Sequence, residues 1–364
     1  MYGNQLQERK DVSVDTRIGV VDLFCGIGGL SYGLRKTGLR ILAGYDLDPT
    51  CAFAYETNNQ ARFIHKDIRE VSGAEVSSFL DGQEVKVLAG CAPCQPFSSY
   101  AFKHKKKDPD KYALLYEFAR LVKEVTPDIV TMENVPQLLS FRIKPVFPDF
   151  VSSLEQLGYS VSASKVYCPD YGIPQARTRL VLLASKYGAI ELIQPTHTRN
   201  NYVTVRDVIA DMPPIAAGEK DVSDPLHRSR SLSPLNLSRI RATPYGGSWS
   251  DWPNSLRLDC HKKSSGKSWC NVYGRMKWEE PAPTITTLCT GYGNGRFGHP
   301  TQDRAISIRE AALLQTFPKE YCFFADEEHI SISQASRYIG NAVPPKLGEV
   351  IGESIITHIN KHLL

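Results

Sequence analysis

The stretch RIGVVDLFCGIGGLSYGLRKTG, residues 17–38, joins a run of β-branched residues to an amphipathic run through three closely spaced glycines. Gly26, Gly28 and Gly29 permit a tight turn and let a ligand come close to the backbone where a helix begins. The order strand, glycine turn, helix predicts the first unit of an α/β sheet, with a ligand beyond the end of the first strand.

The same alternation continues to residue 185. Strand-like runs recur at 40–46, 84–90, 127–133 and 179–185, and helix-like stretches lie at 28–38, 49–58 and 111–125. Strands that alternate with helices predict a doubly wound α/β sheet, mixed or parallel, of Rossmann-like type.

The rest of the chain has a different texture. Residues 1–16 form a polar tail, and residues 186–303 are rich in Pro, Gly, Ser, Arg and Trp with little periodicity. All four tryptophans lie there, and residues 227–277 hold ten Lys and Arg against two Asp and Glu. Helical patterning returns over 304–364. We expect a large domain at 17–185, a smaller irregular domain at 186–303 with most tryptophans in its core, and a last helix that packs back on the sheet.

Composition narrows the class of protein. The 364 residues are 42% hydrophobic and 23% charged, as in globular proteins. No apolar run reaches the ~18–20 residues of a membrane helix, and the N-terminus lacks the apolar core of a signal peptide. The nine cysteines, odd in number and irregularly spaced, are therefore expected to be reduced thiols in an intracellular protein. A net charge of +4 does not by itself indicate nucleic acid.

Carboxylates at three segment ends indicate the ligand. Asp22 precedes the glycine turn, where its charge would repel a pyrophosphate and favour a cation such as a sulfonium. Asp46 ends the second strand and is placed to accept from ribose hydroxyls, and Asp67-Ile68 is a candidate contact for an adenine amino group. S-adenosylmethionine fits this set, while a nicotinamide or flavin fold, or a turn without a ligand, stays an alternative.

The stretch AGCAPCQPFSSY, residues 89–100, places Cys91 at a strand end and Cys94 in the loop that follows. A redox C-x-x-C pair usually opens a helix, whereas Pro96 follows here. A zinc site would need two more ligands, and the cysteines and histidine at 260–270 give no familiar zinc pattern, so no metal is expected. Cys94 is the candidate nucleophile, and Cys91 a bystander packed against the sheet.

A nucleophile needs partner groups. Glu133 in MENVP ends a strand, and Arg177 and Arg179 in QARTR precede another. Each alone could be an ordinary surface or ion-pair residue. A thiol, a carboxylate and guanidinium groups at neighbouring strand ends beside a nucleoside site favour a catalytic set.

With these motifs assembled, the chain resembles the DNA (cytosine-5)-methyltransferases of prokaryotic restriction-modification systems. DLFCGIGGLS is similar to the family's cofactor loop, GCAPCQPFS to its nucleophile loop, MENVP to its acid strand and QARTR to its paired arginines. RAISIREAALLQTFP and GNAVPP resemble its later motifs, in the family's order. Leu313 and Thr316 stand where the family pattern leads us to expect Arg and Gly.

The resemblance implies a chemistry. The Cys94 thiolate would attack C6 of a flipped-out cytosine so that C5 can accept the methyl group of S-adenosylmethionine. Glu133 would contact N3 and the exocyclic amine, Arg179 would hold O2 with support from Arg177, and Pro93 would stiffen the loop. The implied cofactor-binding residues are Phe24, Gly26, Ile27, Gly28, Gly29, Asp46, Leu47, Asp67, Ile68 and Asn341.

The resemblance also implies that 17–185 and 304–364 form the catalytic domain and that 186–303 recognises the target in double-stranded DNA. Gln95, Ser98, Lys105 and Lys106 in the loop after Cys94 are candidate DNA contacts, because basic side chains meet phosphates and small polar groups lie near the site. Further candidates in the recognition domain are Arg241, Arg275 and Arg296.

Three alternatives remain open at this point. A tRNA cytosine methyltransferase of the same fold is the nearest, although the 118-residue insert at 186–303 favours duplex DNA. A catalytically dead DNA-binding relative would be expected to have lost Cys94 or Glu133. A dithiol oxidoreductase would require both Cys91 and Cys94. The expected protein is a cytoplasmic, nucleoid-associated prokaryotic monomer without a membrane segment, with a cognate restriction endonuclease as system partner.

Overall fold

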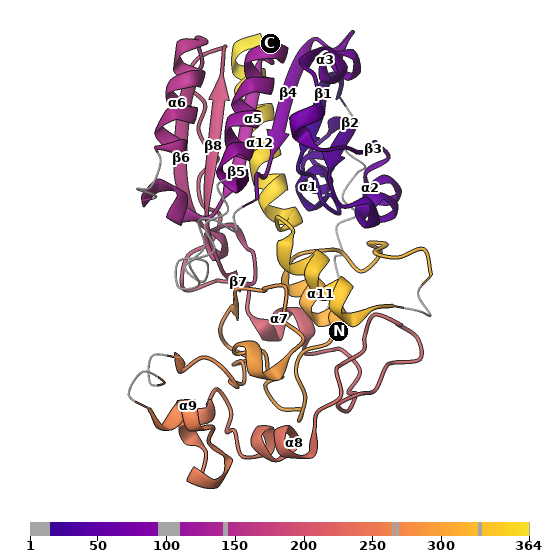
Figure 1. Cartoon of the computed structure of the whole chain (residues 1–364), viewed down its shortest axis with the longest axis vertical. Helices are drawn as coiled ribbons and strands as arrows, with labels where there is room; N and C mark the ends of the chain where they lie inside the picture. Colours follow the sequence, from indigo (N-terminus) through magenta and orange to yellow (C-terminus); the bar gives the residue numbers. More distant parts are fainter. Residues whose placement is uncertain are drawn as a thin grey trace, which may run out of the picture.

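A central β-sheet organises the upper half of the molecule (Figure 1). The structure is a computed structural model that describes residues 15–93, 110–140, 145–263, 266, 269–326 and 330–363. The strands of the sheet are β1 (Asp15–Leu23), β2 (Leu39–Asp46), β3 (Arg62–His65), β4 (Val85–Gly90), β5 (Ile129–Asn134), β6 (Ser160–Tyr167) and β8 (Thr178–Ser185). Their order is β3-β2-β1-β4-β5-β8-β6. The pairs from β3 to β5 are parallel, and β8 runs antiparallel to both its neighbours, so the sheet is mixed.

Helices cover both faces of this sheet, because its strands carry apolar side chains on both sides. On one face lie α3 (Gly73–Leu80), α5 (Asp110–Val125) and α6 (Val146–Gln156). On the other lie α1 (Gly29–Lys36), α2 (Ala52–Asn59) and α12 (Pro345–Leu363). The last helix, yellow in Figure 1, packs its Leu347, Ile351 and Ile355 into the same cluster as Leu34 of α1. This confirms both the doubly wound α/β class and the return of the C-terminal helix to the sheet.

The five strands that the sequence predicts are all present, and two more join them. β3 has only four residues, and β6 at the sheet edge is exposed along much of its length. Neither has the continuous apolar run of a buried strand, so hydrophobic patterning does not reveal them. The predicted helices correspond to α1, α2 and α5, while α3 and α6 were not anticipated.

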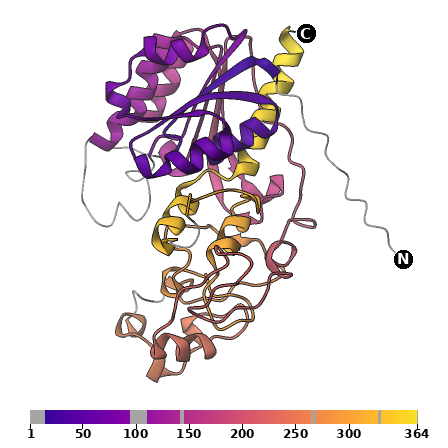
Figure 2. The same ribbon diagram turned by 90° about the vertical axis from the view of Figure 1, so that its right-hand side faces the viewer.

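Below the sheet the chain forms a second, mostly irregular layer (Figures 1 and 2). Its regular elements are α7 (Val205–Ile209), α8 (Pro234–Arg241), α9 (Asp259–Lys262), α10 (Ile308–Leu314), α11 (Ile332–Asn341) and the two-stranded pair β7 (Gln175–Ala176) and β9 (Ala282–Pro283). One hydrophobic cluster joins α7, α10 and α11, so residues after 304 share a core with the irregular segment before α12 begins. The domain boundaries at 186 and 303 stay a prediction.

A smaller cluster lies at the far end of this lower layer. Trp249 and Trp252 are buried there with Ile240 and Tyr292. The Trp249 ring stacks on His261, with 4.1 Å between ring centroids. Trp278 is partly buried against the neighbouring cluster, whereas Trp269 is 49% exposed. Most tryptophans therefore do form core, as the sequence predicts.

Candidate functional site

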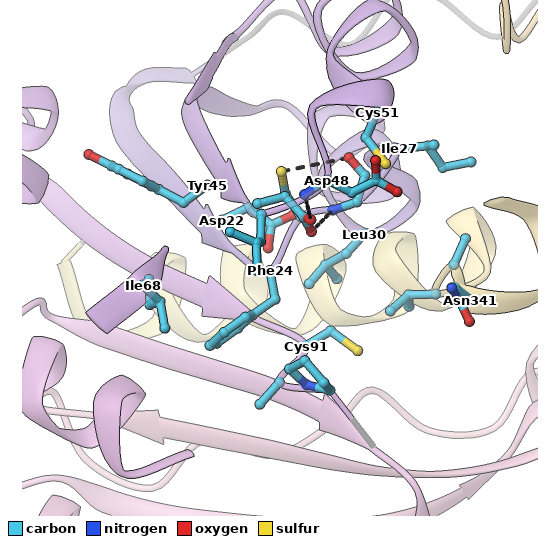
Figure 3. A pocket seen from close by; sticks show the side chains of 18 of the residues that line it. Asp22, Phe24, Ile27, Leu30, Tyr45, Asp48, Cys51, Ile68, Cys91 and Asn341 are labelled. Atoms are coloured by element: carbon cyan, nitrogen blue, oxygen red, sulfur yellow. Dashed lines mark hydrogen bonds between the residues drawn. The ribbon is translucent and has the colours of Figure 1, made fainter. Parts of the chain in front are cut away.

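A pocket of about 380 Å³ opens beyond the carboxyl ends of β1 and β2, where ligands of open α/β sheets bind. Figure 3 shows Ile68 and Tyr45 toward one end of it, Cys51, Ile27 and Asn341 toward the other, and Phe24 between. The expected cofactor-binding residues that line it are Phe24, Gly26, Ile27, Gly29, Asp46, Leu47, Asp67, Ile68 and Asn341. Segments separated by some 300 residues thus meet at one cavity.

Gly28 lies behind the pocket wall. It is the N-cap of α1 in the left-handed conformation, with φ 89°. A Cβ there would overlap the Asn59 amide and come within 2.9 Å of the Tyr55 ring. Its role in the structure is therefore to let the first turn of α1 pack against α2, which places the neighbouring turn residues at the pocket.

The turn before α1 is tied to the end of β2. Asp46 accepts a hydrogen bond from the Gly26 amide at 2.8 Å and another from the Asp48 amide at 2.9 Å. Burial raises the pKa of the Asp46 carboxyl, and these two backbone donors partly offset that effect. Phe24 adopts a left-handed backbone with φ 60°, which is costly for a non-glycine residue and places its side chain at the middle of the cavity.

Asp22 is fully buried at the end of β1 and also lines the cavity. Its Oδ2 accepts a hydrogen bond from the Ser31 hydroxyl at 2.6 Å, whereas Oδ1 has no partner among the described residues. Burial raises the pKa of Asp22 to about 7, opposed by the Ser31 hydrogen bond and reinforced by the nearby Asp46 charge. A cation in the pocket would lower this pKa and restore the full negative charge.

The opposite end of the pocket is formed after β3. The Asp67 carboxylate is fixed by Arg69, whose Nε lies 3.0 Å from Oδ1 and whose guanidinium also reaches Oδ2 at 2.6 Å. These hydrogen bonds hold the pKa of Asp67 below its usual value. Ile68 is buried beside it and, with Leu114, gives this end of the cavity apolar walls.

The sequence prediction missed pocket residues on α11. Arg337 donates to Asp48 at 2.8 Å, and Tyr338 donates to the Thr50 carbonyl at 2.6 Å, so α11 is joined to the loop after β2. Both lie three or four residues before Asn341, on the same helix face. That spacing, once the segment is taken as a helix, is the signal that could have found them.

Glu133 and Arg179 meet next to this pocket. Glu133 ends β5 and is 3% exposed, and its Oε1 lies 2.9 Å from Nε of Arg179 on the antiparallel neighbour β8. Cys91, which follows β4, donates its thiol proton to the other carboxylate oxygen at 3.0 Å. The expectation that Cys91 is a bystander against the sheet is therefore incomplete, because Cys91 contacts the candidate catalytic acid.

Arg177 is buried a short distance away. Its guanidinium donates to the carbonyls of Ile285 at 3.2 Å and Ala342 at 3.4 Å, so it bridges β9 and the segment before α12. Burial lowers the pKa of Arg177 to about 10, and the positive charge of Arg179 adds to that shift. These bonds hold the Arg177 guanidinium within the protein, and its supporting role stays a prediction.

The nucleophile itself, Cys94, lies outside the described residues, as do Gln95, Ser98, Lys105 and Lys106. Pro93, the last residue described before that gap, lines the pocket together with Cys91 and Ala92. The described chain before this gap therefore ends at the pocket wall, two residues after Cys91, which contacts Glu133.

The three arginines expected to contact DNA are placed differently from one another. Arg241 is 65% exposed, with Nε 3.5 Å from the Asp303 carboxylate. Arg275 is buried, and its guanidinium donates to the carbonyls of Ile240, Thr243, His299 and Gln302 and to Asp303. Arg296 donates to three backbone carbonyls of its own domain. Arg275 is buried and its donors are taken up by these acceptors, so it holds parts of the lower layer together. Arg296 is partly buried and uses Nη1 for its three bonds, so its contact with DNA stays a prediction.

Two further observations concern metal and membrane. Over the described ranges, no group of His, Cys, Asp and Glu side chains is arranged to hold a metal ion. In the same part of the chain, no helix is long and apolar enough to cross a membrane.

This geometry can be compared with known proteins. Residues 18–357 match the family model of the C-5 cytosine-specific DNA methylases, and the chain belongs to this family. It is 55% identical over 336 residues to the type II methylase M.HgiDII of Herpetosiphon aurantiacus, covering 92% of this chain and 94% of that one. It is 30% identical over 339 residues to the type II methyltransferase M1.HphI of Haemophilus parahaemolyticus, covering 92% and 86%.

Solved structures share the fold. A DNA modification methyltransferase encoded within an Escherichia coli prophage superposes with a TM-score of 0.72 at 21% identity, over 94% of this chain and 99% of that one. Spodoptera frugiperda DNMT2 gives a TM-score of 0.63 at 16% identity, over 93% and 99%. These structures show the shared fold, while the family predicted from six short motifs is confirmed by the family model over residues 18–357 and by the 55% identical relative.

Proposed function

We propose that this DNA (cytosine-5)-methyltransferase transfers a methyl group from S-adenosylmethionine to C5 of a cytosine in a short duplex DNA sequence. The observation that carries the proposal is a series of contacts that leads from the cofactor pocket to Arg179. Pro93 and Cys91 line the pocket, Cys91 contacts Glu133, and Glu133 contacts Arg179. A nucleophile at Cys94 would therefore stand between a nucleoside-sized cavity and a carboxylate–guanidinium pair.

The residues of the pocket fit S-adenosylmethionine. The unpartnered Oδ1 of Asp22 is a buried acceptor that favours a cationic ligand. At Gly26 the space beyond the backbone is open, since an added Cβ would meet no atom of the described chain within 4 Å. Asp46 would bind the ribose hydroxyls, and Asp67 and Ile68 the adenine. The cofactor supplies a methyl group made electrophilic by its sulfonium.

The chain's own residues would perform the other steps. The Cys94 thiolate adds to C6 of cytosine, which raises electron density at C5 and lets C5 take the methyl group. Glu133 contacts N3 and the exocyclic amine and Arg179 holds O2, so both stabilise charge that develops on the ring. Loss of the C5 proton to solvent then re-forms the C5–C6 double bond and expels the thiolate.

Access to C6 requires the base to leave the stack. The loop around Gln95, Ser98, Lys105 and Lys106 would close over the flipped base, and the lower layer would contact the duplex. Arg241 is the candidate phosphate contact that its exposure supports. A cognate restriction endonuclease, a monomeric state and a cytoplasmic, nucleoid-associated location are part of the same proposal, supported by the type II relatives.

The direct test measures tritium transfer from methyl-labelled S-adenosylmethionine to unmethylated duplex DNA and, in parallel, to tRNA. Transfer to DNA that the Glu133→Gln variant loses supports the proposal. Transfer to tRNA alone would move the substrate to the rival class, and no transfer to either from folded protein would contradict the proposed chemistry.

A further inference from the structure

Cys91 occupies a position between two parts of the site. It directly follows β4, and its side chain forms part of the cofactor pocket wall near Phe24 (Figure 3). On its other side, the thiol proton points to the Glu133 carboxylate, with Sγ 3.0 Å from Oε2. The side chain is partly buried, in contact with the hydrophobic cluster that includes α1 and α12.

The two oxygens of the Glu133 carboxylate have different partners. Nε of Arg179 forms an ion pair with Oε1 at 2.9 Å, but among the described residues no hydrogen bond reaches Oε1. The Cys91 thiol donates a hydrogen bond to Oε2. Because Glu133 is only 3% exposed, bulk water cannot take over the orientation of this group. A buried carboxylate that loses one of its donors also loses the orientation that the donor imposes.

We propose that Cys91 is a positioning residue for the methyl-transfer reaction, whose thiol fixes the plane of the Glu133 carboxylate toward the cytosine. The inference rests on the proposed function, in which Glu133 contacts the base. Arg179 alone would leave the carboxylate free to rotate about that single contact. The ion pair keeps Oε1 near Arg179, and the directional hydrogen bond from Cys91 to Oε2 fixes the carboxylate plane, as preorganised hydrogen bonding to a reacting base requires.

This role differs from the two other uses of a cysteine at this place. A redox partner of Cys94 would be needed as a thiolate or disulfide, whereas here the thiol keeps its proton and shares it with Glu133. A side chain that only packs against apolar neighbours would be replaced better by an apolar residue than by one with a hydroxyl. The hydrogen bond therefore predicts an order among substitutions that packing does not.

The experiment compares Cys91→Ala, which removes the donor, with Cys91→Ser, which keeps one. We expect Cys91→Ala to lower kcat about tenfold, the effect of a lost hydrogen bond to a charged group. KM for S-adenosylmethionine and for DNA should stay within about twofold, because the variant removes a single sulfur atom from the pocket wall and leaves the other lining residues in place. Cys91→Ser should recover most of kcat, although its shorter C–O bond pulls the donor back from Glu133.

A packing role predicts the reverse order, because alanine resembles a partly buried cysteine more than a hydroxyl does. The matched control is Cys322→Ala, which removes another partly exposed thiol, one that donates to the Glu320 carbonyl at 3.5 Å, and should leave kcat unchanged. If Cys91→Ala does not fold, Cys91→Val provides a donor-free side chain of similar volume, with the same order expected against Cys91→Ser.

The outcomes separate this inference from the function on which it rests. If Glu133→Gln abolishes transfer while Cys91→Ala keeps kcat within twofold, or while Cys91→Ser is no better than the donor-free variant, the positioning role is overturned and the function stands. If the wild-type protein transfers no methyl group, or Glu133→Gln retains full kcat, the proposed function itself fails.

Discussion

Replacing Gly28 with alanine would test how the cofactor turn is built. Its φ of 89° costs an L-residue roughly 1–2 kcal/mol, and the new Cβ would overlap the Asn59 amide and approach the Tyr55 ring at 2.9 Å. Asn59 cannot swing away freely, because its amide donates to the Tyr55 carbonyl at 2.9 Å and the side chain is buried. Overpacking of this kind adds roughly 1–3 kcal/mol, so we expect a total loss of about 2–5 kcal/mol.

Gly82→Ala is the matched control, because Gly82 has a φ of 77° but no atom within 4 Å of an added Cβ. It should cost only the roughly 1–2 kcal/mol of backbone strain. Urea denaturation of the three proteins, with equal m-values, measures both changes in the free energy of unfolding. Equal losses in Gly28→Ala and Gly82→Ala would refute the packing argument and leave conformational strain as the whole effect.

Three further predictions follow from charge and backbone geometry. Because burial raises the pKa of Asp22 from 3.8 to about 7, the folded state favours the neutral acid, and the free energy of unfolding should fall as pH rises from 4 to 7. Measured against Asp22→Asn, that fall should be at most about 4 kcal/mol, and parallel curves for the two proteins would contradict the assignment. Thr316 has φ 69°, and its hydroxyl accepts a hydrogen bond from the Lys346 amide at 3.0 Å. In thermal unfolding, Thr316→Ala should therefore destabilise the protein by about 1 kcal/mol and Thr316→Gly by less, since glycine adopts this conformation without strain. The reverse order would show that the left-handed conformation of Thr316 is not strained. Arg241→Ala should weaken DNA binding and reduce the salt dependence of binding by about one released counterion, without changing Tm. Arg275→Ala should instead lower Tm, because its guanidinium bonds are lost. The opposite pattern would show that Arg275, and not Arg241, contacts DNA.

The catalytic half of the fold could be predicted from the sequence because its signals are local. The β-branched run, the glycines and the amphipathic stretch that predict the first strand and helix all lie within some twenty residues. Each predicted strand corresponds to a buried strand of the sheet. β3 and β6 were missed because one is too short and the other too exposed to carry a hydrophobic pattern.

Thr316 shows that a departure from a family pattern can carry structural information. The pattern led us to expect glycine there, and the structure places Thr316 in the left-handed region that glycine adopts without cost. The hydrogen bond to the Lys346 amide identifies what the threonine gains in exchange.

Contacts between distant segments could not be predicted in the same way. Arg275 in a basic stretch resembles a DNA contact, yet the acceptors around its guanidinium lie at 240, 243, 299, 302 and 303 and become neighbours only after folding. Likewise Cys91 and Glu133 are 42 residues apart, and only the parallel pairing of β4 with β5 brings the thiol to the carboxylate. Side-chain type indicated chemistry, whereas burial decided which residues were free to perform it.

The central claim is that the Cys94 thiolate adds to C6 of a cytosine in DNA, so that C5 takes the methyl group of S-adenosylmethionine. The most direct measurement is bisulfite sequencing of plasmid DNA from cells, free of other cytosine-5 methylation, that express the wild-type chain or Cys94→Ser. We predict protected cytosines within one short recurring sequence for the wild-type protein and none for Cys94→Ser. Protection by both proteins, or by neither when both are folded and bind S-adenosylmethionine, would contradict the account.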